Sequence, residues 1–398
     1  MKPYKIAFLL SHPIQYFSPL FRELAEHSHI DLTVYYCSDE SIREMKDVGF
    51  GKEIKWDIPL LDDYKYKFLK NYSPKPSIFS GSFGLINFGI VNELKRGKYD
   101  AIIIHGWNYF TNIVAIITAK LFGVKVFIRG ENPLNQELKK PRYKILTKKI
   151  ILKNLLFRII DAFLYVGQEN KEFYRFYGVP ENKLFFVPYA VENERFIKDY
   201  EELKDNKEKI KKEIGIPPDK VVILFSGKLT DKKRPMDLLM AYERINFENR
   251  AHVYLGDGIL RKSLEDYAKE KGLKDVYFLG FKNQTELSKY YALADIFVLP
   301  SGIGETWGLV VNEAMCFSLP IIVSDMVGSA KDLVKNGENG FIFKTGDINE
   351  LSECLLKLLQ EPELREKMGK RSLEIISRWS YKEDVVAILR TVEYVIKH

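Results

Sequence analysis

Cysteine, histidine and long apolar runs are all scarce in this chain of 398 residues. The three cysteines, Cys37, Cys316 and Cys354, show neither paired nor metal-type spacing, which predicts a reduced, cytosolic setting without a disulfide framework. No run of 18 apolar residues occurs, so the sequence predicts no transmembrane helix. The apolar run at residues 6–10 is too short for a secretory signal and is expected to be a first β-strand.

The net charge of +7 suits an acidic partner, such as a nucleotide, a nucleic acid or an anionic lipid. The charge alone chooses none of these partners. Zinc-knuckle spacing and nucleic-acid-binding motifs are both lacking, so we expect no nucleic-acid partner.

Short apolar runs alternate with helix-like segments along the whole chain, which predicts an α/β fold with parallel sheets. A chain of this length is too long for one core, so two doubly wound domains of similar size are expected. The segment at residues 198–220 is dense in charge and is interpreted as a solvated connection between them. The expected strands are residues 5–10, 32–37, 101–104, 124–128, 162–166 and 184–187, then 221–225, 252–255, 276–279, 296–299, 320–323 and 341–343.

Polar residues and glycines follow most of these strands, and ligands of open α/β sheets bind at the carboxyl ends of strands. The density of such residues favours a cleft between two facing domains. In the first half the candidates for this cleft are His12, Gln15, His105, Arg129 and Glu131. A single histidine at a strand end is more often a packing or capping residue, but two of them, His12 and His105, favour function.

The segment at residues 300–325 holds two carboxylates, Glu305 and Glu313, with seven residues between them. A glycine-rich loop leads into a helix expected to begin near Gly308. The start of a helix offers unpaired N–H groups and the positive end of the helix dipole, which together bind anions such as phosphate. The alternative interpretation is an ordinary surface helix with two solvated glutamates.

A basic element follows the first strand of the second half. Gly227 and Lys228 come directly after that strand, and Lys233 lies five residues further on. Glycine allows a ligand to approach the backbone, and an ammonium is a suitable point charge for a diphosphate. A basic surface turn is the alternative, and the nearby helix start favours the phosphate interpretation.

These elements together resemble the family 4 retaining glycosyltransferases. The segment at 300–325 is similar to the E-x7-E signature of that family, and GKLTDKKRP at 227–235 is similar to its G-[RK]-x4-K element. Gly256-Asp257-Gly258, Gly280-Phe281 and VPYAVENERF at 187–196 are similar to further family elements, in the same order along the chain.

The resemblance implies the GT-B fold, in which two facing Rossmann-like domains enclose an interdomain cleft. The implied domains are an acceptor-side domain at 1–195, a nucleotide-sugar-binding domain at 196–378, and a C-terminal helix at 379–398 that crosses back to the first domain. The absence of an Asp-x-Asp triplet agrees with the metal independence usual for this fold, so no metal and no cofactor are expected.

The resemblance also implies roles for individual residues. Lys228 and Lys233 would hold the donor diphosphate and, with Glu305, form the catalytic set. Glu305 would contact the sugar hydroxyls and Glu313 the ribose. The implied donor-binding residues are Gly227, Phe281, Thr306, Trp307, Gly308, Leu309 and Glu313.

The chain departs from the family in three places. His12-Pro13-Ile14-Gln15 replaces a glycine-rich loop, Arg129-Gly130-Glu131 stands where many members carry a histidine, and Arg234 stands where the family often has glycine. The first two departures leave the acceptor side and the role of any histidine open.

Residues 139–158 carry eight basic residues and no acidic one. Such a segment with apolar neighbours favours an anionic membrane surface. Its lysines are scattered around the helical wheel, so a buried helix with snorkelling lysines is an equal alternative.

The sequence therefore predicts a cytoplasmic or peripherally membrane-bound retaining glycosyltransferase of the hexosyltransferase type. It would move a sugar from a UDP- or GDP-type donor to a glycan or lipid-linked acceptor, in cell-surface polysaccharide or glycoconjugate synthesis. A nucleotide-sugar epimerase on the same fold, a non-catalytic nucleotide- or glycan-binding subunit and a nucleic-acid binder are the alternatives.

Overall fold

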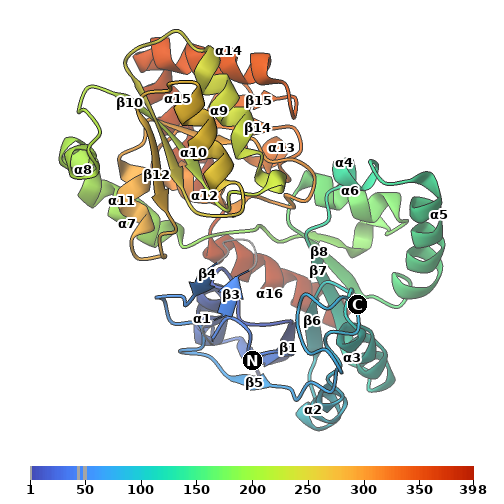
Figure 1. Ribbon diagram of the computed structural model, residues 1–398. Coiled ribbons are helices and arrows are strands. Elements are labelled where there is room, and N and C mark those ends of the chain that lie inside the picture. Colours follow the sequence, from blue (N-terminus) through green and yellow to red (C-terminus); the bar gives the residue numbers. More distant parts are fainter. Residues whose placement is uncertain (1, 43–44, 48–51) are drawn as a thin grey trace. The chain divides into compact units, whose positions relative to one another are not determined.

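The computed structural model describes residues 2–42, 45–47 and 52–398 (Figure 1). The chain forms two compact units, each with its own sheet. The first consists of Met1–Met45, Ile54–Tyr189 and Tyr381–His398, and the second of Lys46–Glu53 and Ala190–Ser380. The cleft expected between two domains stays a prediction. Among the described residues, no helix has the length and apolar character needed to cross a membrane.

The first unit is built on a parallel sheet of seven strands in the order β5-β2-β1-β6-β7-β8-β9. The strands are β1 (Tyr4–Leu10), β2 (Ile30–Tyr36), β5 (Tyr66–Phe68), β6 (Ala101–His105), β7 (Lys125–Gly130), β8 (Ala162–Tyr165) and β9 (Leu184–Phe186). The helices are α1 (Ser18–Glu26), α2 (Gly89–Gly97), α3 (Phe110–Leu121), α4 (Leu134–Glu137), α5 (Arg142–Ile151), α6 (Gln168–Phe176) and α16 (Tyr381–Lys397). A π-helical turn, Leu152–Leu156, continues α5, and a 3-10 turn, Glu181–Lys183, precedes β9.

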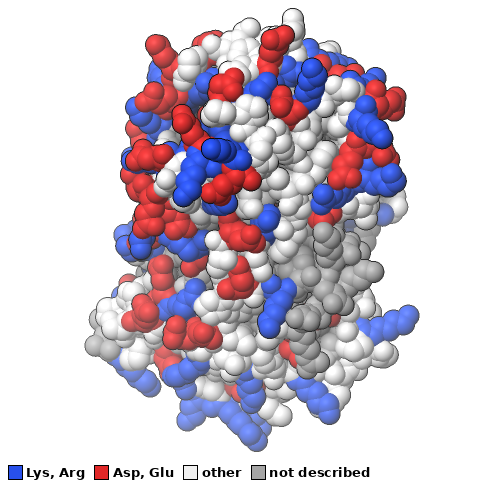
Figure 2. All heavy atoms as spheres, turned by 60° about the vertical axis from the view of Figure 1, so that its left-hand side comes forward, with Lys and Arg blue, Asp and Glu red and all other residues white. Residues whose placement is uncertain are grey.

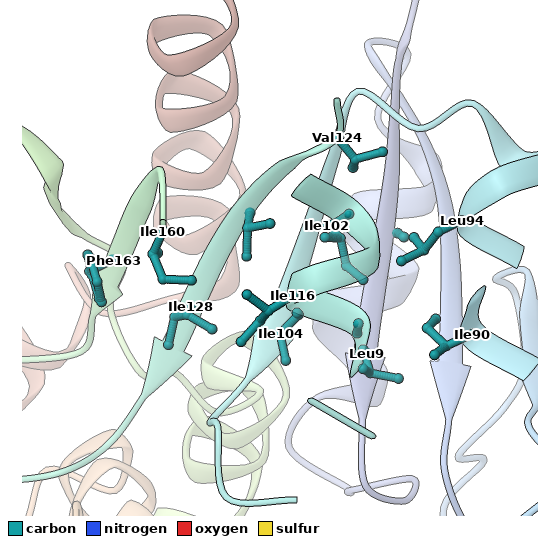
Figure 3. Packing of buried hydrophobic residues seen from close by; sticks show 14 of the residues in the cluster. Leu9, Ile90, Leu94, Ile102, Ile104, Ile116, Val124, Ile128, Ile160 and Phe163 are labelled. Atoms are coloured by element: carbon teal, nitrogen blue, oxygen red, sulfur yellow. The ribbon is translucent and has the colours of Figure 1, made fainter. Parts of the chain in front are cut away.

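Both faces of this sheet are covered, so its central strands are continuous apolar runs such as the Ile102–Ile104 stretch of β6. On one face, Leu9, Ile104 and Ile128 point towards Ile116 of α3 and Ile90 of α2 (Figure 3). On the other face, Phe8 contacts Phe17 and Phe21 of the α1 region at ring-centre distances of 6.1 and 4.9 Å. The strand alternation thus directs successive side chains into two separate helix layers.

The second unit has a parallel sheet of six strands in the order β12-β11-β10-β13-β14-β15. The strands are β10 (Val221–Ser226), β11 (Arg250–Leu255), β12 (Val276–Gly280), β13 (Ile296–Leu299), β14 (Ile321–Ser324) and β15 (Gly340–Phe343). The helices are α7 (Asn193–Leu203), α8 (Lys207–Ile214), α9 (Pro235–Arg244), α10 (Arg261–Glu270), α11 (Leu287–Ala292), α12 (Leu309–Cys316), α13 (Ala330–Leu333), α14 (Ile348–Gln360) and α15 (Pro362–Ile376). Two 3-10 turns, Lys204–Asn206 and Asp231–Lys233, complete this unit.

All twelve strands expected from the sequence are present, with ends that differ by up to two residues. The α/β prediction with two parallel sheets is confirmed. Three strands escaped prediction: β5 and the two strands of a separate small sheet, β3 (Met45–Asp47) and β4 (Lys52–Ile54). Each of these has only three residues, which is too short for a periodic pattern to show.

The segment at 198–220 lies within the second unit and not between the two units, and it is largely helical, with α7, a 3-10 turn and α8. More than half of its residues are exposed, as the solvated interpretation expected. Ile210 of α8 is buried, and the Lys211 ammonium donates to the carbonyls of Pro218 and Lys220, the former at 3.1 Å and the latter at 2.6 Å. The prediction of a connection between domains was wrong because a high charge density does not exclude a packed helix: lysine can bury its stem and satisfy its ammonium with backbone oxygens.

A buried ion pair fixes the C-terminal helix α16 to the sheet of the first unit. The guanidinium of Arg129, in β7, donates to both carboxylate oxygens of Asp384 at 2.9 and 3.0 Å and to the Pro188 carbonyl at 3.0 Å. It also lies over the rings of Phe17 and Tyr189. Arg129 and Asp384 are each about 1% exposed or less. Water therefore solvates neither charge, and each charge is stabilised by the other.

We expect Asp384→Ala to lower the free energy of unfolding by about 3–5 kcal/mol, because it leaves the Arg129 guanidinium buried without a counter-charge. Urea denaturation measures this loss. The double variant Arg129→Met/Asp384→Leu, which removes both charges, should recover most of it. Lys120→Met, which breaks the half-exposed Lys120–Asp161 pair in the same unit, is the control and should cost about 1 kcal/mol or less. An equal effect of Lys120→Met and Asp384→Ala would contradict the assignment.

Candidate functional site

Both large sheets contain a point where the direction of strand order reverses. In the second unit the chain builds outward from β10 through β11 and β12, and then from β13 through β14 and β15 on the other side of β10. The corresponding point in the first unit lies between β1 and β6. Loops leave in opposite directions at such a point and expose the strand ends to a ligand. Most of the candidate residues follow the strands on either side of these points.

In the second unit, the loop after β10 is held against the loop after β11 by backbone contacts. The Gly227 N–H donates to the Leu255 carbonyl at 2.9 Å. Gly256 has a φ of 141°, and a Cβ at that position would lie 2.0 Å from the Gly227 carbonyl oxygen. Glycine is therefore required at Gly256 for the two loops to meet, and Lys228 follows directly from this junction.

The loops after β10 and β13 are joined by an ion pair. Lys233 closes the 3-10 turn after β10, and its ammonium lies against the Glu305 carboxylate in the loop after β13. The Lys233 and Glu305 side chains are only 14% and 8% exposed. Ser301 donates its hydroxyl to Glu305 at 3.0 Å, and the Gly302 N–H donates to the Lys232 carbonyl at 2.8 Å. Two of the three residues expected to be catalytic thus lie in direct contact.

The electrostatic environment keeps Glu305 ionised. Burial alone would raise the pKa of Glu305, but the positive charges of Lys233 and Lys232 outweigh burial and lower this pKa below its ordinary value. Glu305 therefore stays a carboxylate and accepts hydrogen bonds rather than donating them.

Lys232 and Arg234 are two further cations here that the sequence analysis did not assign to the site. The Lys232 side chain lies beside Gly304, since a Cβ on that glycine would be 3.4 Å from Lys232 Cδ. Arg234 has a φ of 51°, the left-handed conformation that glycine adopts most easily. This backbone conformation agrees with the glycine that the family often has at this position. In this chain the Nε of Arg234 donates a hydrogen bond to Asp237 at 2.6 Å. The basic run DKKR was the signal for both residues.

The start of α12 lies next to this ion pair. Gly308, with a φ of 92°, directly precedes the helix that begins at Leu309, as expected. The Gly328 N–H donates to the Glu305 carbonyl at 3.1 Å, and the Ser329 N–H donates to the Trp307 carbonyl at 3.0 Å. A Cβ on Gly328 would lie 1.8 Å from the Thr306 carbonyl oxygen. The loop from Glu305 to Gly308 is thus held by Gly328 and Ser329, which orients the first N–H groups of the helix.

The remaining donor-side candidates lie in different surroundings. Glu313, in the second turn of α12, is 1% exposed and accepts a hydrogen bond from the Tyr291 hydroxyl at 2.6 Å. The indole of Trp307 is also buried and donates to Asn312 at 3.0 Å. Phe281 follows β12 directly and is half-buried. Tyr291, on α11, had no signal in the sequence because its partner is 22 residues away.

In the first unit, the strand-end candidates form a second polar cluster. The His105 Nε2 lies 3.1 Å from a Glu131 carboxylate oxygen, and both side chains are about one-fifth exposed. Burial would raise the pKa of Glu131, but the hydrogen bond and the charge of His105 lower it below its ordinary value, with help from the Tyr189 hydroxyl. The pair joins the ends of β6 and β7.

His12 and Gln15 lie after β1, in the turn that leads to α1, and both are half-buried. Burial and, to a smaller extent, the nearby His105 lower the pKa of His12 to about 4, so the imidazole is neutral at pH 7. Its Nδ1 lies 2.9 Å from the Ser11 hydroxyl. Arg129 has a different place from the one expected: its side chain points into the interior of the unit and pairs with Asp384.

The fold is shared with solved structures, among them WaaG, a glycosyltransferase involved in lipopolysaccharide biosynthesis, with a TM-score of 0.66 at 15% identity over 98% of this chain and 99% of that chain. The crystal structure of Alr3699/HepE from Anabaena in complex with UDP and glucose has a TM-score of 0.73 to this chain, at 18% sequence identity. The likeness covers 98% of this chain and 100% of that chain. The two parallel α/β sheets and this likeness define the class as the GT-B fold of glycosyltransferases.

Comparison of sequences gives the family. Residues 206–374 match the family model "Glycosyl transferases group 1". This match lies within the second unit. It confirms the family resemblance that the motifs of this part of the chain showed.

Two curated relatives illustrate the range of the similarity. The N-acetyl-alpha-D-glucosaminyl L-malate synthase of Bacillus anthracis is 28% identical over 201 residues, which cover 50% of this chain and 52% of that protein. The UDP-Gal:alpha-D-GlcNAc-diphosphoundecaprenol alpha-1,3-galactosyltransferase of Escherichia coli is 29% identical over 275 residues, which cover 67% of this chain and 68% of that protein. The matched part of the chain spans about half the length of the first such relatives.

The lowered pKa of His12 predicts a pH dependence of stability. Between about pH 6.5 and pH 4 the unfolded chain binds a proton that the folded His12 does not, so acidification through this range favours unfolding. We expect the wild-type protein to lose up to about 3 kcal/mol more than His12→Gln between these pH values. Urea denaturation at a series of pH values measures the difference. The same pH dependence for both proteins would contradict the lowered pKa of His12 in the folded protein.

Proposed function

We propose that this protein is a retaining glycosyltransferase that uses a nucleoside-diphosphate sugar as donor. The observation that carries the proposal is the contact between Lys233 and Glu305 at the strand-order reversal of the second unit, next to the start of α12. A diphosphate bound by Lys228, Lys233 and the first N–H groups of α12 would place its attached sugar beside Glu305.

The chemistry follows from what these groups can do. Breaking the bond from the sugar to the diphosphate develops negative charge on the leaving phosphate, and the lysines and helix N–H groups stabilise that charge. Glu305, held as a carboxylate, accepts hydrogen bonds from sugar hydroxyls. In the reaction that the family resemblance implies, the acceptor enters on the face from which the phosphate departs, and the phosphate takes the acceptor's proton. The lysines then contribute the main catalytic effect.

Several observations support the donor and acceptor classes. One solved structure that is similar to this chain over nearly its whole length contains UDP and glucose. The Escherichia coli relative is named for UDP-Gal and an alpha-D-GlcNAc-diphosphoundecaprenol acceptor. We therefore propose a UDP- or GDP-type donor and a glycan or lipid-linked acceptor, in polysaccharide or glycoconjugate synthesis. A thermal-shift series with UDP, GDP, ADP and their sugars identifies the base, because a ligand that binds only the folded protein raises the melting temperature.

No metal is included in the proposal. Among the described residues, no group of three His, Cys, Asp or Glu side chains could hold a metal ion. Turnover that is unchanged by excess EDTA would agree with a role for the lysines in place of a metal, whereas loss of turnover restored by a divalent cation would contradict it.

The His105–Glu131 pair favours a second candidate, a nucleotide-sugar epimerase, which would need its own histidine and carboxylate. Incubation with the donor alone separates the two functions. Rapid formation of an epimer without any acceptor would overturn the transferase proposal. A non-catalytic nucleotide- or glycan-binding subunit would keep its cellular function after Glu305→Ala, whereas a transferase loses most of its turnover.

We expect Lys228→Ala and Lys233→Ala to weaken binding of the nucleoside diphosphate about 10- to 100-fold, since each removes a charge-assisted contact. Turnover should fall about 100-fold or more, because the same charge stabilises the leaving group. Calorimetry with the nucleoside diphosphate and initial rates with both substrates measure these effects.

Lys262→Ala is the matched control, because this lysine is exposed on α10 and pairs with Asp266 one turn further along the same helix. It should change neither binding nor turnover. Equal effects of the Lys228 and Lys233 variants on donor and acceptor KM values would contradict the phosphate assignment.

A further inference from the structure

One segment of the first unit accounts for the net positive charge of the protein. Residues 138–160 contain eight lysines and arginines and no acidic residue. The whole chain has a net charge of +7, so all the other residues together carry a net charge of −1. On the face of the molecule drawn in Figure 2, by contrast, basic and acidic side chains are interspersed over most of the upper half.

The helix in this segment, α5, exposes apolar side chains. None of its residues is buried, and Tyr143, Leu146 and Ile150 are 67%, 61% and 56% exposed. Their spacing of three and four residues puts them on one face of the helix. Ile151 and, in the following π-helical turn, Leu155 extend the exposed apolar surface. The alternative of a buried helix with snorkelling lysines is therefore wrong.

Contacts on the opposite side of α5 fix this orientation. The Lys148 ammonium donates to Glu137 at 2.9 Å and lies 4.7 Å from the centre of the Phe173 ring on α6. The Lys149 ammonium lies 4.5 Å from the centre of the Phe176 ring, also on α6. These two lysines attach the helix to the unit, and the apolar face with Tyr143 points away from it.

Cations flank this apolar face. Lys139, Arg142 and Lys144 are all exposed. In the part of the chain that the structure describes, no carboxylate lies within ion-pair distance of any of the three. Their charge is thus available to an external partner, beside side chains that gain free energy when they leave water.

We propose that α5 and its flanking residues bind the surface of a bilayer that contains anionic lipids. The apolar side chains would enter the boundary between headgroups and acyl chains, and the basic residues would lie among lipid phosphates. A second copy of this chain fits less well, because a symmetric contact would bring two basic segments together. Nucleic acid would use the cations but would leave the apolar face exposed. The proposal does not depend on the proposed transferase activity.

Co-sedimentation of the full-length protein with vesicles tests the proposal. The protein should bind vesicles of phosphatidylcholine and phosphatidylglycerol in a ratio of about three to one, and not vesicles of phosphatidylcholine alone. Salt at roughly 0.5 M should release it, because the Debye length then falls to about 4 Å. The variant Lys139→Glu/Arg142→Glu/Lys144→Glu should bind at least about tenfold more weakly.

A second pair of variants tests the apolar face. Leu146→Ser/Ile150→Ser alters only exposed side chains, so the fold should be kept while vesicle binding weakens. Tyr143→Trp should show a blue shift of its fluorescence on addition of the anionic vesicles, since that residue would leave water.

The matched control is Lys262→Glu/Lys269→Glu/Lys367→Glu, which makes the same change of charge on exposed lysines of α10 and α15. It should bind the vesicles as the wild-type protein does. Binding to neutral and anionic vesicles alike, or equal loss with both triple variants, would overturn the proposal. So would a lipid-free dimer that Leu146→Ser/Ile150→Ser dissociates, because α5 would then be an interface between copies.

Discussion

All neighbouring strands of the two large sheets run parallel, and this one constraint decides where polar chemistry can occur. A parallel sheet must be covered on both faces, so its strands are apolar throughout and its helices use their inner faces for packing. Polar side chains are then left mainly to the loops at the strand ends. Because all carboxyl ends of a parallel sheet share one edge, residues far apart in the sequence, such as Lys233 and Glu305, are brought into contact there.

This contact places a cation and an anion where water is largely excluded. Each charge would be costly alone, and each lowers the cost of the other. The ion pair also keeps the two loops at a fixed separation. A charged ligand could then bind to these side chains without further ordering of the protein. A site of this kind stabilises charge that develops during a reaction more strongly than a flexible, hydrated lysine would. The ion pair of Arg129 and Asp384 is also buried, but it is enclosed by Phe17 and Tyr189 and holds α16 to the sheet of the first unit.

The contrast between these two ion pairs shows which contacts could be predicted from the sequence and which could not. The strands and the start of α12 were predictable because apolar runs and glycine at Gly308 are local signals. The neighbourhood of Lys228, Lys233 and Glu305 was predictable because strand ends of one sheet share an edge. The partner of Arg129 was not, since Asp384 is 255 residues away and belongs to a helix whose position only the folded unit defines. For the same reason Tyr291 could not be linked to Glu313 before the structure was known.

Lysine shows why composition alone could not decide between structural and functional charge. Lys211 satisfies its ammonium with backbone carbonyls, Lys148 with Glu137, and Lys233 with Glu305. A count of basic residues treats all of these as equal to Arg142 or Lys144, yet the buried or paired ones contribute little to the field outside the protein. What remains after such pairing is the charge that a distant partner experiences. Three such cations, Lys139, Arg142 and Lys144, lie beside the exposed apolar face of α5. The net charge therefore becomes informative only when the folded contacts show which basic side chains are already paired.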